Sequence, residues 1–539
     1  MGRRRKNVRI RISGAAMKTG DRNPIPEKRD KWAKEGTAIL KKITAVMIAG
    51  ILLPGMLSVS SLALGDGKNP VSRSCKFFGE GNPISSQVFC ADPTAVEYNG
   101  RLYVYGTSDR QQCDIKGPDA DNTYEMIKSI EVFSTDDMVN WEYHGAINVG
   151  EIAPWIANSW APSVVSRAEE DGLTHFYLYF SNNGTGCGVI TATDPLGPWS
   201  DPLGRPLIRS DTPGLTDCPN PFDPGAVIDG DGVGWLSFGG GRAGNGTEYM
   251  PGSARIVRLG PDMLSFDSEF VVIPAPYFFE ASELNYINGT WIYTYCSDWS
   301  DHGSRWEYGT PAPGSCAMIW MKTNTPLDPE SWEMGGECLK NPGEFGFDYS
   351  NNHTHLQKFM DRWYIFYHTL VLRKAMGIRG GYRSICVDEI RVDEEAAVIE
   401  GGKGTRQGVT VPPRTVSPYV PHPGAQIAAG ADISYDVSDV RAPLAVSNGK
   451  GAWTSFLRAD FSAEGRPEKA VFSARVQGPG EVEVRLDSPT GRLIARVSAE
   501  RGEAPIPHWI AAVHDLYFVF SEKGASVVTW EIIGDLSDP

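Results

Sequence analysis

The chain has 539 residues, a formal net charge of −15 at pH 7 and 41% hydrophobic residues. It is too long for one ordinary domain and apolar enough to bury a sizeable core. The acidic balance argues against nucleic acid as a partner, because phosphate binding needs clustered Lys and Arg, and 59 Gly with 38 Pro favour short strands and turns over helices.

Residues 1–64 are predicted to form an N-terminal leader. Residues 1–42 are polar and basic, residues 43–64 are apolar, and Ser61-Leu62-Ala63 resembles a small-residue cleavage site. We expect a signal peptide that is removed near Ala63, and therefore a secreted or cell-surface protein without stable membrane insertion. The basic part is long for a signal peptide, so a start at Met17 or a retained membrane anchor stays open.

A short pattern recurs five times between residues 71 and 407, at intervals of about 55–75 residues. After each copy comes a turn and an apolar, aromatic-rich strand. The copies are Ala91-Asp92-Pro93, Trp160-Ala161-Pro162, Phe222-Asp223-Pro224, Phe279-Glu280-Ala281 and Asn352-His353-Thr354. This loose period is typical of propeller blades. We expect residues 71–407 to form a five-bladed β-propeller with four strands in each blade, and the copies to surround one central channel.

The composition of the sequence changes after residue 407. Residues 408–424 are rich in Pro, which fixes φ and removes a hydrogen-bond donor, so we expect an extended linker. Residues 425–539 read as short strands separated by turns and are predicted to form a small β-sandwich. The predicted fold class is therefore all-β, a five-bladed β-propeller followed by a small β-sandwich domain.

Nine cysteines lie between residues 75 and 386. In an oxidising compartment several should pair, and the odd number leaves at least one free. No Cys-x-x-Cys spacing occurs, which argues against a zinc site. Their connectivity is not deducible from sequence.

Three copies of the repeat carry a carboxylate, and the pattern places Asp92, Asp223 and Glu280 in the same register. A single Asp-Pro pair is usually a turn. Three like charges facing one channel would repel one another, so such a cluster is expected where function requires it. Glycoside hydrolysis needs one carboxylic acid to protonate the leaving oxygen and one carboxylate to activate water. A third carboxylate can raise the pKa of the acid by repulsion.

The repeat region resembles glycoside hydrolase family 43. The resemblance rests on five segments: Ala91-Asp92-Pro93-Thr94, Asp223-Pro224, Phe279-Glu280-Ala281-Ser282, Asn352-His353 and Arg383-Ser384-Ile385-Cys386-Val387-Asp388. It implies a five-bladed β-propeller and inversion at the anomeric carbon. It also implies Asp92 as general base, Asp223 as modulator of the acid's pKa and Glu280 as general acid.

Further substrate-binding candidates are Trp160, Arg383, His353 and Phe180. The resemblance implies that Arg383 contacts the sugar and that His353 lies under the active site, near a water cluster or a calcium ion bound through water. No cofactor is expected to be required, and a structural calcium is one alternative, although calcium prefers oxygen ligands. An indole at Trp160 suits stacking on a sugar ring, and Phe180 is a candidate for the rim. The alternative for each is a packing role.

Residues 482–494 and 513–520 resemble carbohydrate-binding module family 6. Members that bind sugar usually hold a ring between two aromatic side chains, and Trp453 is one candidate. The stretch Arg501-Gly502-Glu503-Ala504-Pro505 departs from the usual loop of that family. Sugar binding and a packing role therefore both stay open for this module.

The sequence predicts a secreted inverting glycosidase that acts on plant cell-wall polysaccharide. The expected activity is release of arabinofuranose from arabinoxylan or arabinan. A β-D-xylosidase or an endo-arabinanase on the same scaffold is the alternative, and a non-catalytic sugar-binding propeller is the alternative from another class.

Overall fold

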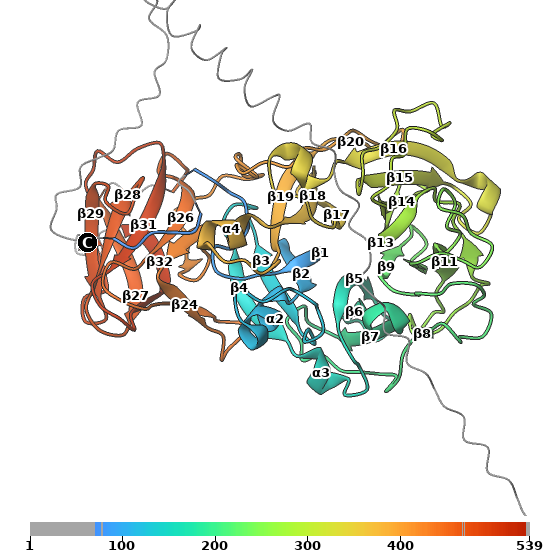
Figure 1. The fold of residues 1–539 in the computed structure, drawn as a ribbon. Coiled ribbons are helices and arrows are strands. Elements are labelled where there is room, and N and C mark those ends of the chain that lie inside the picture. The colour runs from blue at the N-terminus through green and yellow to red at the C-terminus, as the bar shows by residue number, and fades with distance from the viewer. Residues whose placement is uncertain (1–70, 77–78, 466, 468, 535–539) are drawn as a thin grey trace, which may run out of the picture. The chain divides into compact units, whose positions relative to one another are not determined.

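The computed structural model describes residues 71–76, 79–465, 467 and 469–534 (Figure 1). The predicted leader, residues 1–64, lies outside the described residues. Within the described part of the chain, no helix is long and apolar enough to cross a membrane. The helices are short: α2 (Asp109–Lys116), α3 (Val149–Ile152) and α4 (Val371–Met376), with 3-10 turns at Asn183–Thr185, Pro329–Ser331 and Pro342–Phe345. The prediction of an all-β chain is confirmed for this part.

Five antiparallel sheets, here called sheets 1 to 5, follow one another between residues 91 and 390. Sheet 1 contains β1 (Ala91–Tyr98), β2 (Arg101–Thr107), β3 (Ile130–Thr135) and β4 (Glu142–Ile147). Sheet 2 contains β5 (Trp160–Ala168), β6 (Thr174–Ser181), β7 (Gly186–Ala192) and β8 (Ile208–Arg209). Sheet 3 contains β9 (Gly225–Ile228), β10 (Gly234–Phe238), β11 (Arg255–Arg258) and β12 (Val271–Val272).

Sheet 4 contains β13 (Phe278–Ile287), β14 (Thr290–Ser297), β15 (Met318–Thr323) and β16 (Glu333–Leu339). Sheet 5 contains β17 (Thr354–Phe359), β18 (Arg362–Thr369) and β19 (Ser384–Ile390). The prediction of four strands in every sheet is therefore wrong for sheet 5. In place of a fourth ladder, the segment before β1 runs beside β19: the Ile84 N–H donates to the Ile385 carbonyl (2.9 Å) and the Cys90 N–H to the Arg383 carbonyl (3.0 Å). The start of sheet 1 is thus tied to the last sheet.

The first strands of successive sheets lie against one another. β1 contacts β5, β5 contacts β9, β9 contacts β13 and β13 contacts β17. The series closes because β17 contacts β1. Side chains hydrogen-bond across these steps: the Val164 N–H donates to Thr94 Oγ1 (3.1 Å), and the Ala226 N–H donates to Ser163 Oγ (2.9 Å). Buried backbone donors at the strand starts thereby find partners in the preceding sheet.

Hydrophobic side chains fill the space between successive sheets. One cluster joins Tyr105 of sheet 1 to Phe176 of sheet 2, the next joins sheets 2 and 3, and others join sheets 3 and 4, 4 and 5, and 5 and 1. Each sheet therefore buries both of its faces, which explains why the repeat strands are so rich in aromatic residues.

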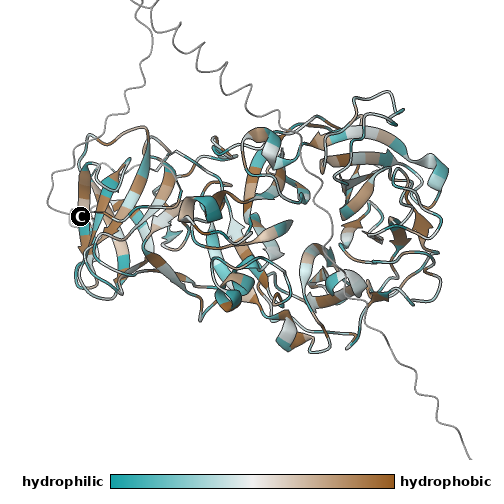
Figure 2. Ribbon diagram, in the orientation of Figure 1, coloured by the Kyte–Doolittle hydropathy of each residue, from teal (hydrophilic) through white to brown (hydrophobic). Residues whose placement is uncertain are grey.

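Two further sheets form the C-terminal region. One contains β22 (His422–Pro423), β32 (Ser526–Gly534), β27 (Ala470–Gln477) and β30 (Glu503–Pro505); the other contains β23 (Ala429–Ala431), β26 (Trp453–Asp460), β31 (Val513–Phe520), β28 (Glu481–Leu486) and β29 (Leu493–Ser498). Two hairpins complete the strands, β20 (Val392–Asp393) with β21 (Val398–Ile399) and β24 (Ile433–Asp436) with β25 (Leu444–Ser447). Both large sheets contribute to one core that includes Phe456, Phe472, Phe518 and Trp530. Hydrophobic and hydrophilic positions alternate along these strands in Figure 2.

Within the predicted linker, residues 408–424, Val416 packs in the core of the C-terminal region and its carbonyl accepts the Asp460 N–H (2.8 Å). One expectation for this region needs correction. Trp453 does not present its ring for stacking on a sugar. Its indole donates to the Ser72 carbonyl (2.8 Å) and packs against Tyr517, so Trp453 is a packing residue.

Candidate active site

The candidate site forms where the first strands of the sheets begin. Asp92, Ala161, Asp223 and Ala281 have φ angles of 50°, 39°, 50° and 63°, in the left-handed region that non-glycine residues rarely adopt. A shift in pairing register follows at this point in β1, β5 and β13. Backbone strain of this kind, repeated at equivalent positions, is typical of functional sites.

These φ angles also correct the predicted alignment of the carboxylates. Ala281, and not Glu280, is the equivalent of Asp92 and Asp223, so Glu280 comes one residue earlier in its repeat. Glu280 pairs with Cys296 in the way that Trp160 pairs with Ser181 and Ala91 with Thr107. Glu280 and Trp160 therefore occupy equivalent positions, and the site does not carry three carboxylates in one register.

Asp92 is held as an ionised carboxylate. Asp92 is 5% exposed, and its Oδ1 accepts a hydrogen bond from Arg383 Nη1 (2.8 Å). Burial by itself would raise the pKa of Asp92, but Arg383, His368 and His353 together bring this pKa well below its usual value. An ionised carboxylate at neutral pH is the form that a general base requires.

His368 and His353 complete the surroundings of Asp92. The Asp92 N–H donates to His368 Nδ1 (3.2 Å), and His368 Nε2 lies 2.9 Å from the Asn351 carbonyl. A ring with its proton on Nε2 satisfies both contacts. His353 Nδ1 lies 3.7 Å from Asp92 Oδ1, and burial lowers the pKa of His353 to about 4 although Asp92 opposes this. His353 is therefore brought to the site as a neutral imidazole.

Arg383 is fixed from the side opposite Asp92. Asp109, at the start of α2, accepts hydrogen bonds from Arg383 Nη2 (2.9 Å), Nε (3.0 Å) and the backbone N–H (2.8 Å). The guanidinium also lies over the Tyr124 ring, with its Cζ 4.8 Å from the ring centroid. A fully buried carboxylate with three such bonds leaves the guanidinium little freedom, so it points at Asp92.

Asp223 and Glu280 form the acidic side of the site. Asp223 Oδ2 accepts the Ala281 N–H (2.9 Å), and Ser181 Oγ donates to Oδ1 (3.2 Å) while it accepts the Asp223 N–H (2.8 Å). Asp223 is thereby positioned beside the residue that follows Glu280. Burial and repulsion from Asp92 raise the pKa of Glu280 to about 7. Burial, Glu280 and Asp92 likewise raise the pKa of Asp223. This side of the site therefore retains a proton near neutral pH.

Of the other predicted substrate contacts, Trp160 lies at the site and Phe180 does not. Trp160 Nε1 donates to the Tyr124 carbonyl (3.1 Å). The indole therefore lies beside Tyr124, whose ring is covered by the Arg383 guanidinium. Phe180 is 0% exposed and stacks on Trp155 in the core between sheets 1 and 2. The prediction that Phe180 contacts substrate is wrong, because the alternation of side chains along β6 turns it into the core.

Calcium does not fit the residues around His353. Within the described ranges, no three or more His, Cys, Asp and Glu side chains are grouped so that they could hold a metal ion. Asp92, the acidic neighbour of His353, is already neutralised by Arg383, whose charge would oppose a cation. Calcium takes six to eight oxygen ligands, and beside His353 the side chain of Asp92 is already bonded to Arg383.

Four residues of the site escaped the sequence analysis: Asp109, Tyr124, Asn351 and His368. Asn351 Nδ2 lies 3.5 Å from Glu280 Oε1, and its carbonyl accepts from His368. His368 is the second-last residue of β18, whereas Thr107 ends β2 and Ser181 ends β6. Each of the three accepts the backbone N–H of a residue with a left-handed φ angle. A polar residue at or beside the end of these three second strands is a signal that the sequence did carry.

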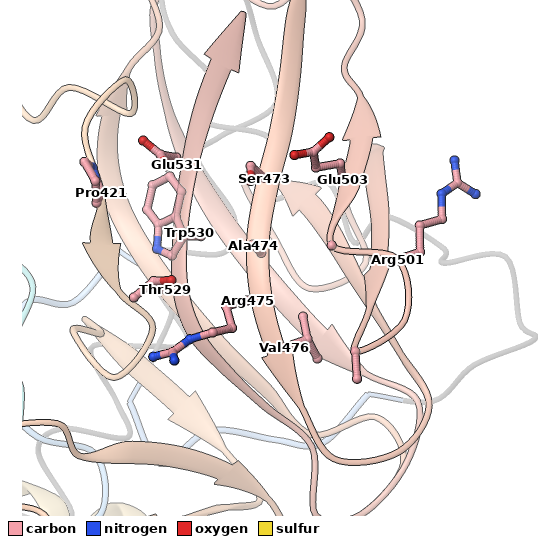
Figure 3. Close-up of a pocket in the computed structure, with 12 residues that line it drawn as sticks. Pro421, Ser473, Ala474, Arg475, Val476, Arg501, Glu503, Thr529, Trp530 and Glu531 are labelled. Atoms are coloured by element: carbon pink, nitrogen blue, oxygen red, sulfur yellow. The ribbon is translucent and has the colours of Figure 1, made fainter. Parts of the chain in front are cut away.

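A pocket of about 560 Å³ lies elsewhere, on the sheet that contains β27 and β32 (Figure 3). It is lined by residues of the C-terminal region only. Trp530 is 1% exposed and belongs to the core, and Arg501 points away from the other labelled side chains. The pocket offers no exposed aromatic face, and none of the charged side chains that line it is buried.

Known proteins match most of the length of this chain. The sequence model of the family described as glycosyl hydrolases family 43 matches residues 80–396, more than half of the chain. Arabinoxylan arabinofuranohydrolases of Bacillus subtilis (strain 168) and Paenibacillus polymyxa are 34% and 33% identical over 478 and 479 residues. These alignments cover 83% and 84% of this chain, and 91% and 73% of the respective relatives.

A solved structure leads to the same result. The crystal structure of a glycoside hydrolase family 43 arabinoxylan arabinofuranohydrolase from Bacillus subtilis, in complex with cellotetraose, matches with a TM-score of 0.74 at 32% identity. The match covers 85% of this chain and 99% of that chain. This chain therefore belongs to glycosyl hydrolase family 43.

Proposed function

We propose that the protein is an inverting α-L-arabinofuranosidase that releases arabinofuranose from arabinoxylan. The observation that carries the proposal is the pairing of an ionised carboxylate, Asp92, with an acid whose pKa is raised to about 7, Glu280. Inverting glycosidases need these two protonation states at one pH. The names of the two relatives, which match along most of this chain, support arabinoxylan as the substrate.

In the proposed mechanism Asp92 takes a proton from water as that water attacks the anomeric carbon. Glu280 donates its proton to the glycosidic oxygen, so the sugar leaves with inverted configuration. Asp223 holds the Ala281 N–H and thereby fixes the backbone beside Glu280. Arg383 keeps Asp92 ionised and, with Trp160 and His353, lines the space for the sugar, where the indole offers a face for stacking.

The proposal extends to architecture and location. Sheets 1 to 5 would be the blades of a five-bladed β-propeller comprising residues 71–407, supported by the contacts of the first strands, which return from β17 to β1. Residues 408–424 would connect it to a β-sandwich, residues 425–539, supported by the core that both C-terminal sheets share. A cleaved leader would deliver the protein to the cell exterior, where its polysaccharide substrate is found.

Product analysis tests the activity. Purified protein is incubated with arabinoxylan, arabinan and the 4-nitrophenyl glycosides of α-L-arabinofuranose and β-D-xylopyranose. We expect free arabinose from arabinoxylan and the aryl arabinofuranoside, and NMR at early times should show the β-anomer first. Free xylose would favour a β-xylosidase, and oligosaccharides from arabinan would favour an endo-arabinanase. Binding without turnover would support the non-catalytic alternative.

A further inference from the structure

Two buried cysteines lie directly behind the proposed acid. Cys296, near the end of β14, pairs in register with Glu280, and Cys316 comes two residues before β15. Their Sγ atoms are 3.4 Å apart, and both residues are 0% exposed. The mechanism proposed above uses neither thiol.

The backbone around the two residues is already paired. The Ser297 N–H donates to the Ala317 carbonyl (2.9 Å) and the Cys316 N–H donates to the Asp298 carbonyl (2.8 Å). Cys296 pairs with Met318 in this ladder, so Cys296 and Cys316 are diagonal neighbours on facing segments. The contact between their Sγ atoms brings the two side chains within reach of a disulfide. Because the sulfur atoms already touch, closing the bond requires rotation of the side chains and not movement of the sheet.

The loop that the two cysteines delimit reaches the site. Residues 298–317 connect β14 to β15. The Cys316 carbonyl accepts hydrogen bonds from the side-chain amides of Asn341 (3.2 Å) and Asn352 (3.5 Å), and Asn352 comes directly after Asn351, the residue beside Glu280. A covalent link between Cys296 and Cys316 would fix both ends of this loop next to Glu280.

We propose that Cys296 and Cys316 form a disulfide bond when the protein folds in the presence of a small-molecule disulfide such as oxidised glutathione. The Cys296 thiolate attacks the glutathione disulfide and releases one glutathione thiolate, which gives a mixed disulfide. The Cys316 thiolate then attacks the Cys296 sulfur and releases the second glutathione. Two protein thiols are oxidised, one glutathione disulfide is reduced to two thiols, and the two protons pass to the glutathione thiolates.

Burial sets when the bond forms. Burial raises the pKa of Cys296 and so disfavours the reactive thiolate in the folded protein. The exchange therefore belongs to folding, when both thiols are accessible, and the folded protein should then protect the bond from reductants. Closing a loop of this length stabilises a protein mainly by restricting its unfolded state.

Peptide mapping tests the proposal without reference to activity. The full-length protein is unfolded, refolded in a glutathione redox buffer or in dithiothreitol, alkylated under denaturing conditions and digested with trypsin. Cleavage after Arg305 places the two cysteines in separate peptides, 259–305 and 306–322, each with one cysteine. We expect these two peptides to be joined in the oxidised sample and separately alkylated in the reduced sample. Separate alkylation after oxidative refolding, or a link from Cys296 to another cysteine, would overturn the proposal.

Single variants provide a second readout. Oxidised wild-type protein should melt on the order of 5 °C above the reduced form. This difference should disappear in Cys296→Ser and in Cys316→Ser, since each removes one partner. Cys386→Ser is the matched control, because Cys386 is equally buried but contacts the Thr369 hydroxyl. If the control loses the difference as well, or if either single variant keeps it, the proposal is wrong.

Discussion

The strands of sheets 1 to 5 differ from those of the C-terminal sheets in how they are buried. All six residues of β3 and all five of β10 are buried, whereas β28 alternates between buried residues and residues that face solvent. Charges in the C-terminal region are accordingly at the surface, where Glu483 pairs with Arg485 and Arg496. In sheets 1 to 5, by contrast, ionisable groups lie at strand starts that are enclosed by neighbouring sheets.

This difference in burial explains why the proposed chemistry belongs to one region. A carboxyl group at the surface interacts only weakly with neighbouring charges because water screens them. Enclosure removes that screening, so Arg383 can hold Asp92 ionised while burial and repulsion keep a proton on the acidic side of the site. Two carboxyl groups with opposite protonation states can then work at the same pH.

Substitution of the two proposed catalytic carboxyl groups should give the largest effect. Asp92→Asn and Glu280→Gln should each lower kcat on the aryl arabinofuranoside by at least about a hundredfold, the scale for loss of a positioned base or acid. Folding should survive, since Arg383 retains Asp109 as a partner and the amides preserve shape. Steady-state kinetics with circular dichroism measure both. Near-normal turnover in either variant would show that the roles are misassigned.

Substitution of Asp109, which holds Arg383 in place, should give the next largest effect. Asp109→Asn weakens a charge-assisted contact of about 1.5–3 kcal/mol, so kcat/KM should fall by about tenfold or more. Because Arg383 lowers the pKa of Asp92, a looser guanidinium should raise this pKa and move the acidic limb of the pH–rate profile to higher pH. Asp114→Asn, on the exposed face of α2, is the matched control. An unmoved acidic limb would leave Asp109 a purely structural residue.

Asp223→Asn should shift the opposite limb of the profile. Activity requires protonated Glu280, whose pKa sets the alkaline limb. Removing the neighbouring carboxylate removes repulsion, so the pKa of Glu280 should fall and the alkaline limb should move to lower pH by about one unit. The pH dependence of kcat/KM measures this. An unmoved alkaline limb would indicate that Asp223 carries the shared proton itself.

These residues show how far the sequence could predict the site. The recurrence of Asp92, Asp223 and Glu280 brought three carboxyl groups together, because a repeat places equivalent residues side by side. It did not fix their register, since the one-residue offset of Glu280 follows from the φ angle of Ala281, which no residue type signals. Asp109 was missed because it lies beyond the repeat, at the start of a helix, and meets Arg383 across 274 positions. Phe180 was misplaced because strands buried on both faces give no alternation of polar and apolar residues to indicate direction.

The smallest effect should come from substitutions in the C-terminal pocket. Arg475 and Glu503 line this pocket and are exposed, so their charges are solvated as in free side chains. Arg475→Ala and Glu503→Gln should leave kcat/KM on the aryl arabinofuranoside within about twofold of wild type, since surface substitutions change free energies by about 0.5 kcal/mol or less. Measuring the same variants on arabinoxylan separates two roles for the region. Equal activity on both substrates would restrict it to packing, whereas a loss on the polymer alone would mean that its solvated face contacts polysaccharide.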